Sequence, residues 1–135
     1  MLGDHLVFPI LLSKDLARTR EFYHDTLGLE ILREDPERII FRCGSGTQVA
    51  VTLSTIGTAD SQTQLAWRVP DLHAELADLR ARGVRIESYQ APDPVTDADG
   101  IADMGYAWAA WIIDPSGNAL SILQVKGPPP APQPA

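Results

Sequence analysis

The chain has 135 residues, of which 44% are hydrophobic and 21% are charged, a composition typical of one globular domain with its own core. Its net charge of −7 disfavours nucleic acid as a partner and favours a cationic ligand. No apolar run approaches the roughly 18 residues that cross a bilayer. The single cysteine, Cys43, excludes an internal disulfide. With no export signal visible at the start, we expect a cytoplasmic protein without membrane partners.

The first half of the chain predicts a strand, a helix and three further strands. The apolar run at 6–12 is typical of a buried strand, interrupted at Pro9, which lacks a ladder donor. A helix follows, capped by Ser13 or Asp15 and closed by Gly28. Turn residues then separate three strand-like pieces at 29–32, 38–42 and 48–53.

The same order begins again after a polar stretch at 54–63. A strand at 64–69 precedes a helix that starts at Asp71 and ends at Gly83, and strands are expected at 84–89, 106–113 and 119–125. The segment 90–105 predicts a loop that could cover a cleft. We therefore expect an α+β fold of two tandem βαβββ modules, 5–54 and 63–126, in one domain (1–126), with a Pro-rich disordered tail at 127–135.

Two short motifs accompany this repeat, each common by itself. They are Asp15-Leu16 with Phe22-Tyr23 and Leu27-Gly28-Leu29, and Asp114-Pro115-Ser116-Gly117-Asn118. Together with the repeat, these motifs resemble the glyoxalase, bleomycin-resistance and dioxygenase superfamily, the vicinal oxygen chelate fold. The resemblance covers residues 5–125 and implies that the modules form a curved mixed sheet around a cleft.

The resemblance also implies where a metal ion would bind. Enzymes of this superfamily hold a divalent ion with His, Gln or Glu on the first and last strands of each module. The matching positions here are Phe8, Ala50, Gln64 and Ser121, of which Gln64 alone is a usual ligand. The chain is therefore predicted to belong to a metal-free branch, with no metal, no cofactor and no catalytic residue.

Histidines offer little replacement for the missing ligands. His5 lies an odd number of residues from Phe8, so strand alternation turns it to the opposite face unless Pro9 makes a bulge. His24 and His73 fall on the helices. An alternative hypothesis nevertheless remains, in which a lyase, isomerase or dioxygenase uses a displaced ligand set of His5, Gln64 and Asp4.

Aromatic residues on the strands suggest a ligand pocket, although most such residues simply form core. Alternation separates Tyr106 and Trp108 from Trp111, and gives Arg68 the parity of Gln64. We expect a protein that sequesters a planar or cationic, antibiotic-like ligand, as a homodimer with two clefts; a ligand-free structural or regulatory dimer is the remaining alternative. The pocket is predicted to be lined by Phe8, Gln64, Arg68, Tyr106, Trp108 and Ser121.

Overall fold

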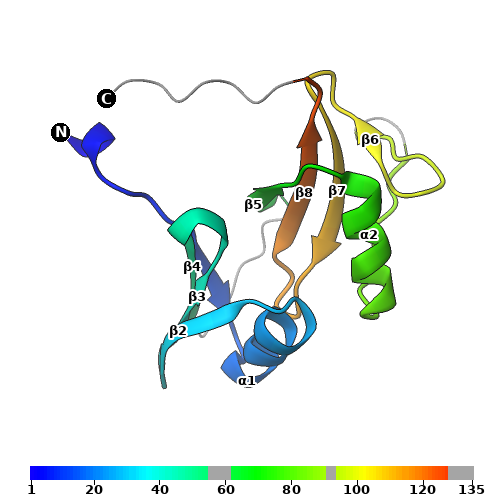
Figure 1. Ribbon diagram of the computed structural model, residues 1–135. Coiled ribbons are helices and arrows are strands. Elements are labelled where there is room, and N and C mark those ends of the chain that lie inside the picture. Colours follow the sequence, from blue (N-terminus) through cyan, green and yellow to red (C-terminus); the bar gives the residue numbers. More distant parts are fainter. Residues whose placement is uncertain (55–61, 91–93, 128–135) are drawn as a thin grey trace.

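The computed structural model describes residues 1–54, 62–90 and 94–127, and shows two four-stranded sheets (Figure 1). The first sheet has the order β1-β4-β3-β2, in which β1 and β4 are parallel and the other neighbours antiparallel. The elements of this module are η1 (Leu2–Asp4), β1 (Ile10–Ser13), α1 (Leu16–Arg20), η2 (Glu21–Thr26), β2 (Glu30–Asp35), β3 (Arg38–Arg42), η3 (Gly44–Gly46) and β4 (Gln48–Leu53).

The second sheet repeats this plan in the order β5-β8-β7-β6, again with one parallel pair, β5 and β8. The predicted α+β fold with two βαβββ modules is therefore confirmed, and neither sheet closes on itself. None of the helices in the described ranges is long and apolar enough to cross a membrane. The elements of the second module are β5 (Thr63–Arg68), α2 (Leu72–Ala81), β6 (Ala102–Asp103), β7 (Ala107–Ile113) and β8 (Ala119–Val125).

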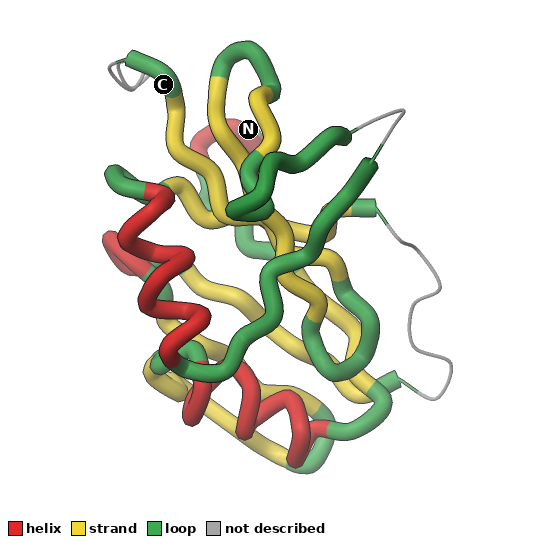
Figure 2. The backbone as a smooth tube through the Cα atoms, turned by 90° about the vertical axis from the view of Figure 1, so that its right-hand side faces the viewer, coloured by secondary structure: helices red, strands yellow, loops and turns green. Residues whose placement is uncertain are grey.

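The two helices begin and end as their sequences predict. The carboxylate of Asp15 accepts a hydrogen bond from the Arg18 amide, and that of Asp71 accepts one from the Ala74 amide. Each side chain thereby satisfies one of the free amides of a first helical turn. The first helix is not regular throughout, since α1 continues into the π-helical η2. Figure 2 shows one helical segment along the left edge of the molecule and another along the bottom.

One hydrophobic core joins the modules. On the first sheet, Phe41 faces the helix and stacks against Tyr23, with ring centroids 5.3 Å apart. On the second sheet, Ile112 and Ile122 face α2 and pack with its buried Leu72 and Leu76. All of these side chains belong to a single cluster of buried residues. The main core is therefore shared by the two modules, and burial of apolar surface between them stabilises both.

A buried polar clasp also connects the modules, formed by the Asp114–Asn118 turn and the first module. The Tyr23 hydroxyl and the side-chain nitrogen Nδ2 of Asn118 each donate a hydrogen bond to Oδ2 of Asp114 at 2.8 Å. Nδ2 of Asn118 also donates to the Leu12 carbonyl at 2.9 Å. Burial, and then the negative charge and hydrogen bond of Asp114, raise the pKa of Tyr23 above its ordinary value. The D-P-x-G-N motif thus holds the two modules together.

The predicted strand at 84–89 is wrong. This segment lies beside β7 and donates one backbone hydrogen bond, from Glu87 N to Trp111 O at 2.9 Å, but it forms no ladder. The strand beside β7 is instead the two-residue β6, paired with Trp108 and Ala109. The predicted strands at 6–12 and 29–32 also differ from the structure, because β1 starts after Pro9 and β2 extends to Asp35.

The N-terminal arm, residues 1–9, runs away from the body of the protein (Figure 1). Its apolar side chains are strongly exposed: the exposed fraction is 95% for Leu6, 89% for Val7 and 50% for Phe8. Ile10, at the start of β1, is 60% exposed. Of the other segments with predictions, 55–61, 91–93 and 128–135 lie outside the described residues.

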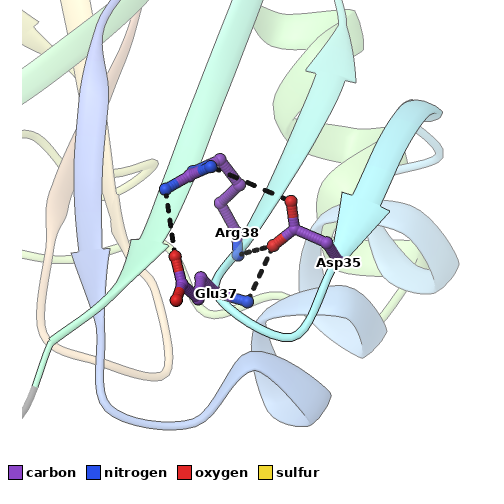
Figure 3. Close-up of polar contacts among 3 residues, drawn as sticks. All are labelled: Asp35, Glu37 and Arg38. Atoms are coloured by element: carbon purple, nitrogen blue, oxygen red, sulfur yellow. Dashed lines mark hydrogen bonds and ion pairs between the residues drawn. The ribbon is translucent and has the colours of Figure 1, made fainter.

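The β2–β3 hairpin is closed by a local charge cluster at its tip (Figure 3). Oδ1 of Asp35 accepts from the Glu37 and Arg38 amides at 2.8 and 3.1 Å, and the Arg38 guanidinium reaches both carboxylates. The Glu37 amide hydrogen bond is the largest effect that lowers the pKa of Asp35, with Arg38 adding to it. Because Arg38 is paired with both carboxylates, this cluster stabilises the turn and is not a candidate binding site.

Candidate functional site

The second sheet has two chemically different faces, fixed by strand register. On the face toward α2, Trp67 of β5 pairs with Ile122, and Trp108 pairs with Gln124. The Gln124 side chain accepts a hydrogen bond from the first amide of α2, Leu72 N, at 2.8 Å, which places it on this face. On the opposite face, here called the open face, Ala66 pairs with Ser121 and Ser121 with Trp111.

Trp111 lies at the centre of the open face. Its indole N–H donates to the Thr63 hydroxyl at 3.1 Å, and the Tyr89 ring meets it edge-on with centroids 5.6 Å apart. Only 8% of Trp111 is exposed, and with Ala102 and Ala109 it forms a small second core. Desolvation, and then the charge of Glu87, raise the pKa of Tyr89. Trp111 was not among the predicted pocket residues, although its pairing with Ser121 places both side chains on the same face.

Strand alternation, on which the predicted pocket rests, does not hold at Gln64. The register of β5 shifts between Thr63 and Leu65, so Gln64 is the extra residue of a bulge, and alternation does not fix its face. Its amide nitrogen donates to the Gln62 carbonyl at 2.9 Å. Ser121 is buried on the open face. The predicted shared parity of Gln64 and Arg68 therefore says nothing about a shared cleft.

Arg68 and Trp108 line one hollow of about 490 Å³, together with Pro70 and Gln124. Their side chains nevertheless leave opposite faces of the sheet, because Arg68 pairs with Leu123 of the open face. The ammonium group of Lys126 lies 4.9 Å from the centroid of the Trp108 ring and is also bonded to the Asp103 carboxylate. Trp108 consequently faces away from Ser121, and these two residues cannot contact one ligand on one face of the sheet.

Phe8 and Tyr106 stand apart from both groups. Phe8 belongs to the exposed N-terminal arm, and Tyr106 is an exposed residue just before β7. The six predicted pocket residues thus fall into separate places: Ser121 and Arg68 on the open face with Gln64 at its bulged edge, Trp108 on the face toward α2, and Phe8 and Tyr106 at exposed ends.

The side chains at the four superfamily metal positions do not make up a metal-binding site. Phe8 and Ala50 carry no donor atom and Ser121 offers a neutral hydroxyl, which leaves the amide oxygen of Gln64 as the one usual ligand among the four positions. Within 1–54, 62–90 and 94–127, no three His, Cys, Asp or Glu side chains come together. Every buried side-chain nitrogen or oxygen in these ranges has a hydrogen-bond partner, so none awaits an ion.

The displaced ligand set does not assemble in a recognisable form either. His5 is exposed on the arm, and the Asp4 carboxylate contacts the chain's own amino terminus at 3.4 Å. His24 contacts the Leu29 carbonyl through Nδ1 at 2.7 Å, and His73 is exposed on α2. None of these histidines is placed on the open face by the described contacts.

Solved structures share this fold over almost the whole chain. A glyoxalase family protein from Enterococcus faecalis superposes with a TM-score of 0.68 at 21% identity, covering 91% of this chain and 99% of that one. A bleomycin-binding protein, in complex with bleomycin, gives 0.66 at 20% identity, covering 90% and 99%. TnmS3, an antibiotic binding protein from Streptomyces sp. CB03234, gives 0.66 at 20%, covering 90% and 96%.

Curated proteins contain no match to this chain. The family model described as the Glyoxalase/Bleomycin resistance protein/Dioxygenase superfamily, however, matches residues 4–122, which span both modules and the inter-module clasp. Together with the two βαβββ modules, this match shows that the chain belongs to the glyoxalase, bleomycin-resistance and dioxygenase superfamily.

Proposed function

We propose that this chain is a metal-independent small-molecule-binding protein that sequesters a planar, cationic ligand on the open face of its second sheet. The observation that carries the proposal is the donor-poor set at the four superfamily ligand positions, where Phe8 and Ala50 replace coordinating side chains. A divalent ion needs several nitrogen or oxygen donors at one point. Without them, binding of an organic ligand is the chemistry that the site supports.

The open face offers apolar and aromatic surface for such a ligand. The indole of Trp111 is held by Thr63 and Tyr89 and is 8% exposed, so it forms the floor of this face, beside the small side chains of Ala66 and Ser121. Rigid aromatic platforms bind planar rings by stacking, and cations by attraction to the ring face. The net charge of −7 favours a cationic partner over an anionic one.

A second copy of the chain is expected to complete the cleft. The arm residues Leu6, Val7 and Phe8 and the adjacent Ile10 expose apolar side chains to solvent, a pattern that marks an interaction surface. The strands β1 and β5 are also free edges of their sheets. An arm that packs on the partner's open face places Phe8 near the ligand and gives each dimer two equivalent clefts.

Two of the structural neighbours support an antibiotic-like ligand. One is a bleomycin-binding protein in complex with bleomycin, and the other, TnmS3, is an antibiotic binding protein. Both share the fold with this chain at 20% identity. Binding that removes a toxic cation from solution requires no chemical step, in agreement with the donor-poor site.

A titration with metal-free bleomycin and a panel of planar cations tests the proposal. We expect saturable binding, seen by calorimetry, in protein that contains no stoichiometric Zn, Ni, Fe or Mn. Phe8→Ala and Trp111→Phe should weaken binding by about tenfold each. Trp108→Phe, on the opposite face, is the matched control and should bind as the wild type does.

Two results would overturn the proposal. One is the absence of binding across the whole panel. The other is a stoichiometric metal in protein purified without a His tag, together with a ligand affinity that falls when the metal is removed by a chelator. Binding that is lost in Trp108→Phe and kept in Phe8→Ala would move the site to the α2 side of the sheet.

A further inference from the structure

The face of the second sheet toward α2 carries an exposed tryptophan beside the start of that helix. Trp108 pairs with Gln124 on this face and is 38% exposed. It lines two hollows, of about 490 and 500 Å³, which share Pro70, Trp108 and Gln124. These three residues, here called the Trp108 surface, are accessible to solvent, whereas Ile112 and Ile122 of the same sheet face are buried in the main core.

The Trp108 surface carries hydrogen-bond donors that no residue of 1–54, 62–90 or 94–127 satisfies. The side-chain oxygen of Gln124 accepts from the Leu72 amide at 2.8 Å, and its Nε2 has no acceptor in these ranges. The indole N–H of Trp108 has none either. The ammonium group of Lys126, paired with Asp103, lies 4.9 Å from the centroid of the Trp108 ring and restricts its orientation. The surface therefore matches a partner that supplies acceptors and apolar rings.

Proline-rich sequences have this chemistry. Proline has no backbone N–H, and a polyproline II helix makes no internal hydrogen bonds, so its carbonyl groups are free to accept. Its rigid rings dock on exposed aromatic side chains and lose little conformational entropy when they do. A tryptophan surface with free donors and a proline-rich segment are therefore complementary.

Such a segment follows β8 in this chain. Residues 128–135 contain five prolines. Gly127, the residue before them, itself lines the 490 Å³ hollow, and it lies in a bend with a φ of +89°, which favours glycine. We propose that residues 128–135 dock as a polyproline II helix on the Trp108 surface of their own chain.

The place where the segment begins favours docking within one chain. Eight residues of polyproline II extend about 25 Å, so the segment can run from Gly127 past Trp108. Because it starts at the edge of the hollow, its effective concentration there is on the order of 1 mM, and weak contacts suffice. The Trp108 surface and Trp111 lie on opposite faces of the sheet. Docking of the segment and binding of a ligand on the open face are therefore independent.

Indole N–H signals in two-dimensional NMR spectra test the docking, because the chain has three tryptophans. The assignment follows from Trp67→Phe, Trp108→Phe and Trp111→Phe. We expect the Trp108 signal to differ between the full chain and a chain that ends at Gly127. The Trp67 and Trp111 signals should stay in place, which also shows that the shortened chain is folded.

The probe is a synthetic peptide of residues 128–135, blocked at both ends and added to the shortened chain. It should return the Trp108 signal toward its position in the full chain, saturably, with a dissociation constant on the order of 1 mM. Gln124→Glu keeps an acceptor for the Leu72 amide and removes the Nε2 donor, so it should weaken peptide binding about fivefold. Gln48→Glu, an equal charge change at an exposed position of the first sheet, is the matched control.

A variant of the full chain tests the segment itself. The double substitution Pro129→Ser, Pro132→Ser should shift the Trp108 signal toward its position in the shortened chain, because it removes two rings and loosens the polyproline II helix. Gln133→Ala, in the same segment, should leave the signal where it is.

Identical Trp108 signals in the full and shortened chains, with no response to the peptide, would refute the docking. A Trp108 signal of the full chain that moves on dilution would assign the segment to a second copy and refute docking within one chain. Equal movement with a Gly-Ser peptide of the same length would refute recognition of proline. A response at Trp111 in place of Trp108 would put the segment on the open face and refute the Trp108 surface as its site.

Discussion

Asp114 shows how one residue can determine the relation between two modules. Its Oδ1 accepts from the Ser116 and Asn118 amides at 2.9 and 2.8 Å, and its Oδ2 accepts from the Tyr23 hydroxyl and the Asn118 side chain. A buried carboxylate with four donors is fully satisfied. The first pair of bonds builds the turn, and the second pair, through Tyr23, reaches the other module.

Replacing Tyr23 by phenylalanine should therefore destabilise the protein and change its pH dependence. Loss of one hydrogen bond to a buried carboxylate costs about 1–3 kcal/mol in the free energy of unfolding. The raised pKa of Tyr23 means that the folded state keeps its phenol proton where the unfolded state loses it, above the ordinary value near 10.0. The contribution is present below that pH and is lost as the pH rises.

Urea unfolding of wild type and Tyr23→Phe between pH 7 and 11 measures both effects. The difference in stability between the two proteins should shrink above about pH 10. A difference that stays constant to pH 11 would show that the Tyr23 phenol titrates normally in the folded protein. Tyr106→Phe, at an exposed position, is the control and should match the wild type throughout.

Residue alternation predicted some features of the site and not others. It correctly placed Trp108 and Trp111 on opposite faces. It could not say which face meets α2, because that depends on contacts such as Gln124 to Leu72, 52 residues apart in the chain. It also failed at Gln64, where one inserted residue changes parity. Which predicted residues share a ligand is accordingly left to the binding experiment.

At the scale of elements, most strands and both helix boundaries were predictable because local signals determine them. The caps Asp15 and Asp71 and the final Gly28 and Gly83 act within one helical turn. The segment 84–89 was mistaken for a strand because Val84 and Ile86 alternate as strand residues do. Alternation reports burial, however, and not ladder hydrogen bonds. The ladder hydrogen bonds with β7 are made instead by β6, a part of the sequence that shows no strand pattern.

Gly100 fixes the path of the segment that leads to β6. Its φ is +84°, and a Cβ at this position would lie 2.8 Å from Cγ2 of Ile86 and 3.3 Å from the Glu87 carbonyl oxygen. Gly117 also has a positive φ, +89°, but a Cβ there meets nothing within 4 Å. A side chain at Gly117 would therefore add backbone strain alone, whereas a side chain at Gly100 would add backbone strain and a steric conflict.

Gly117→Ala should cost about 1–2 kcal/mol of stability from backbone strain alone. Gly100→Ala should cost about 1–3 kcal/mol more, because Ile86 and the backbone of Glu87 must also move. Chemical unfolding of both variants gives the comparison. Equal destabilisation would mean that the 84–103 segment yields without cost, and that its packing beside β7 contributes little to stability.

At the scale of the molecule, the modules form one folding unit with two incomplete faces. The main core contains side chains from both sheets and both helices. The arm before β1, Ile10 on the first sheet and Ala66 on the open face remain exposed in a single chain, whereas Trp111 and Ser121 are buried. The proposed dimer follows from this arrangement, since a second copy covers apolar surface that the chain cannot cover itself.

Charging the arm should consequently dissociate the dimer without unfolding the chain. We expect the double variant Leu6→Asp, Val7→Asp to elute as a monomer in size-exclusion chromatography with light scattering, and its circular dichroism to match the wild type. Val95→Asp is the control, because Val95 is also apolar and 56% exposed. A dimer that survives both changes would place the interface elsewhere, and a monomeric wild type at micromolar concentration would refute the dimer.

The two turns that close the sheets' last hairpins have unequal roles. In the first module the turn is satisfied within itself, with the Cys43 amide bonded to the Thr47 carbonyl and the Thr47 hydroxyl to the Gly44 carbonyl. Its counterpart at 114–118 reaches the other module. A chain in which another copy of the first half replaced the second would lack Asp114 and leave the Tyr23 hydroxyl without its acceptor. The duplicated halves are therefore no longer interchangeable and must be inherited as a pair.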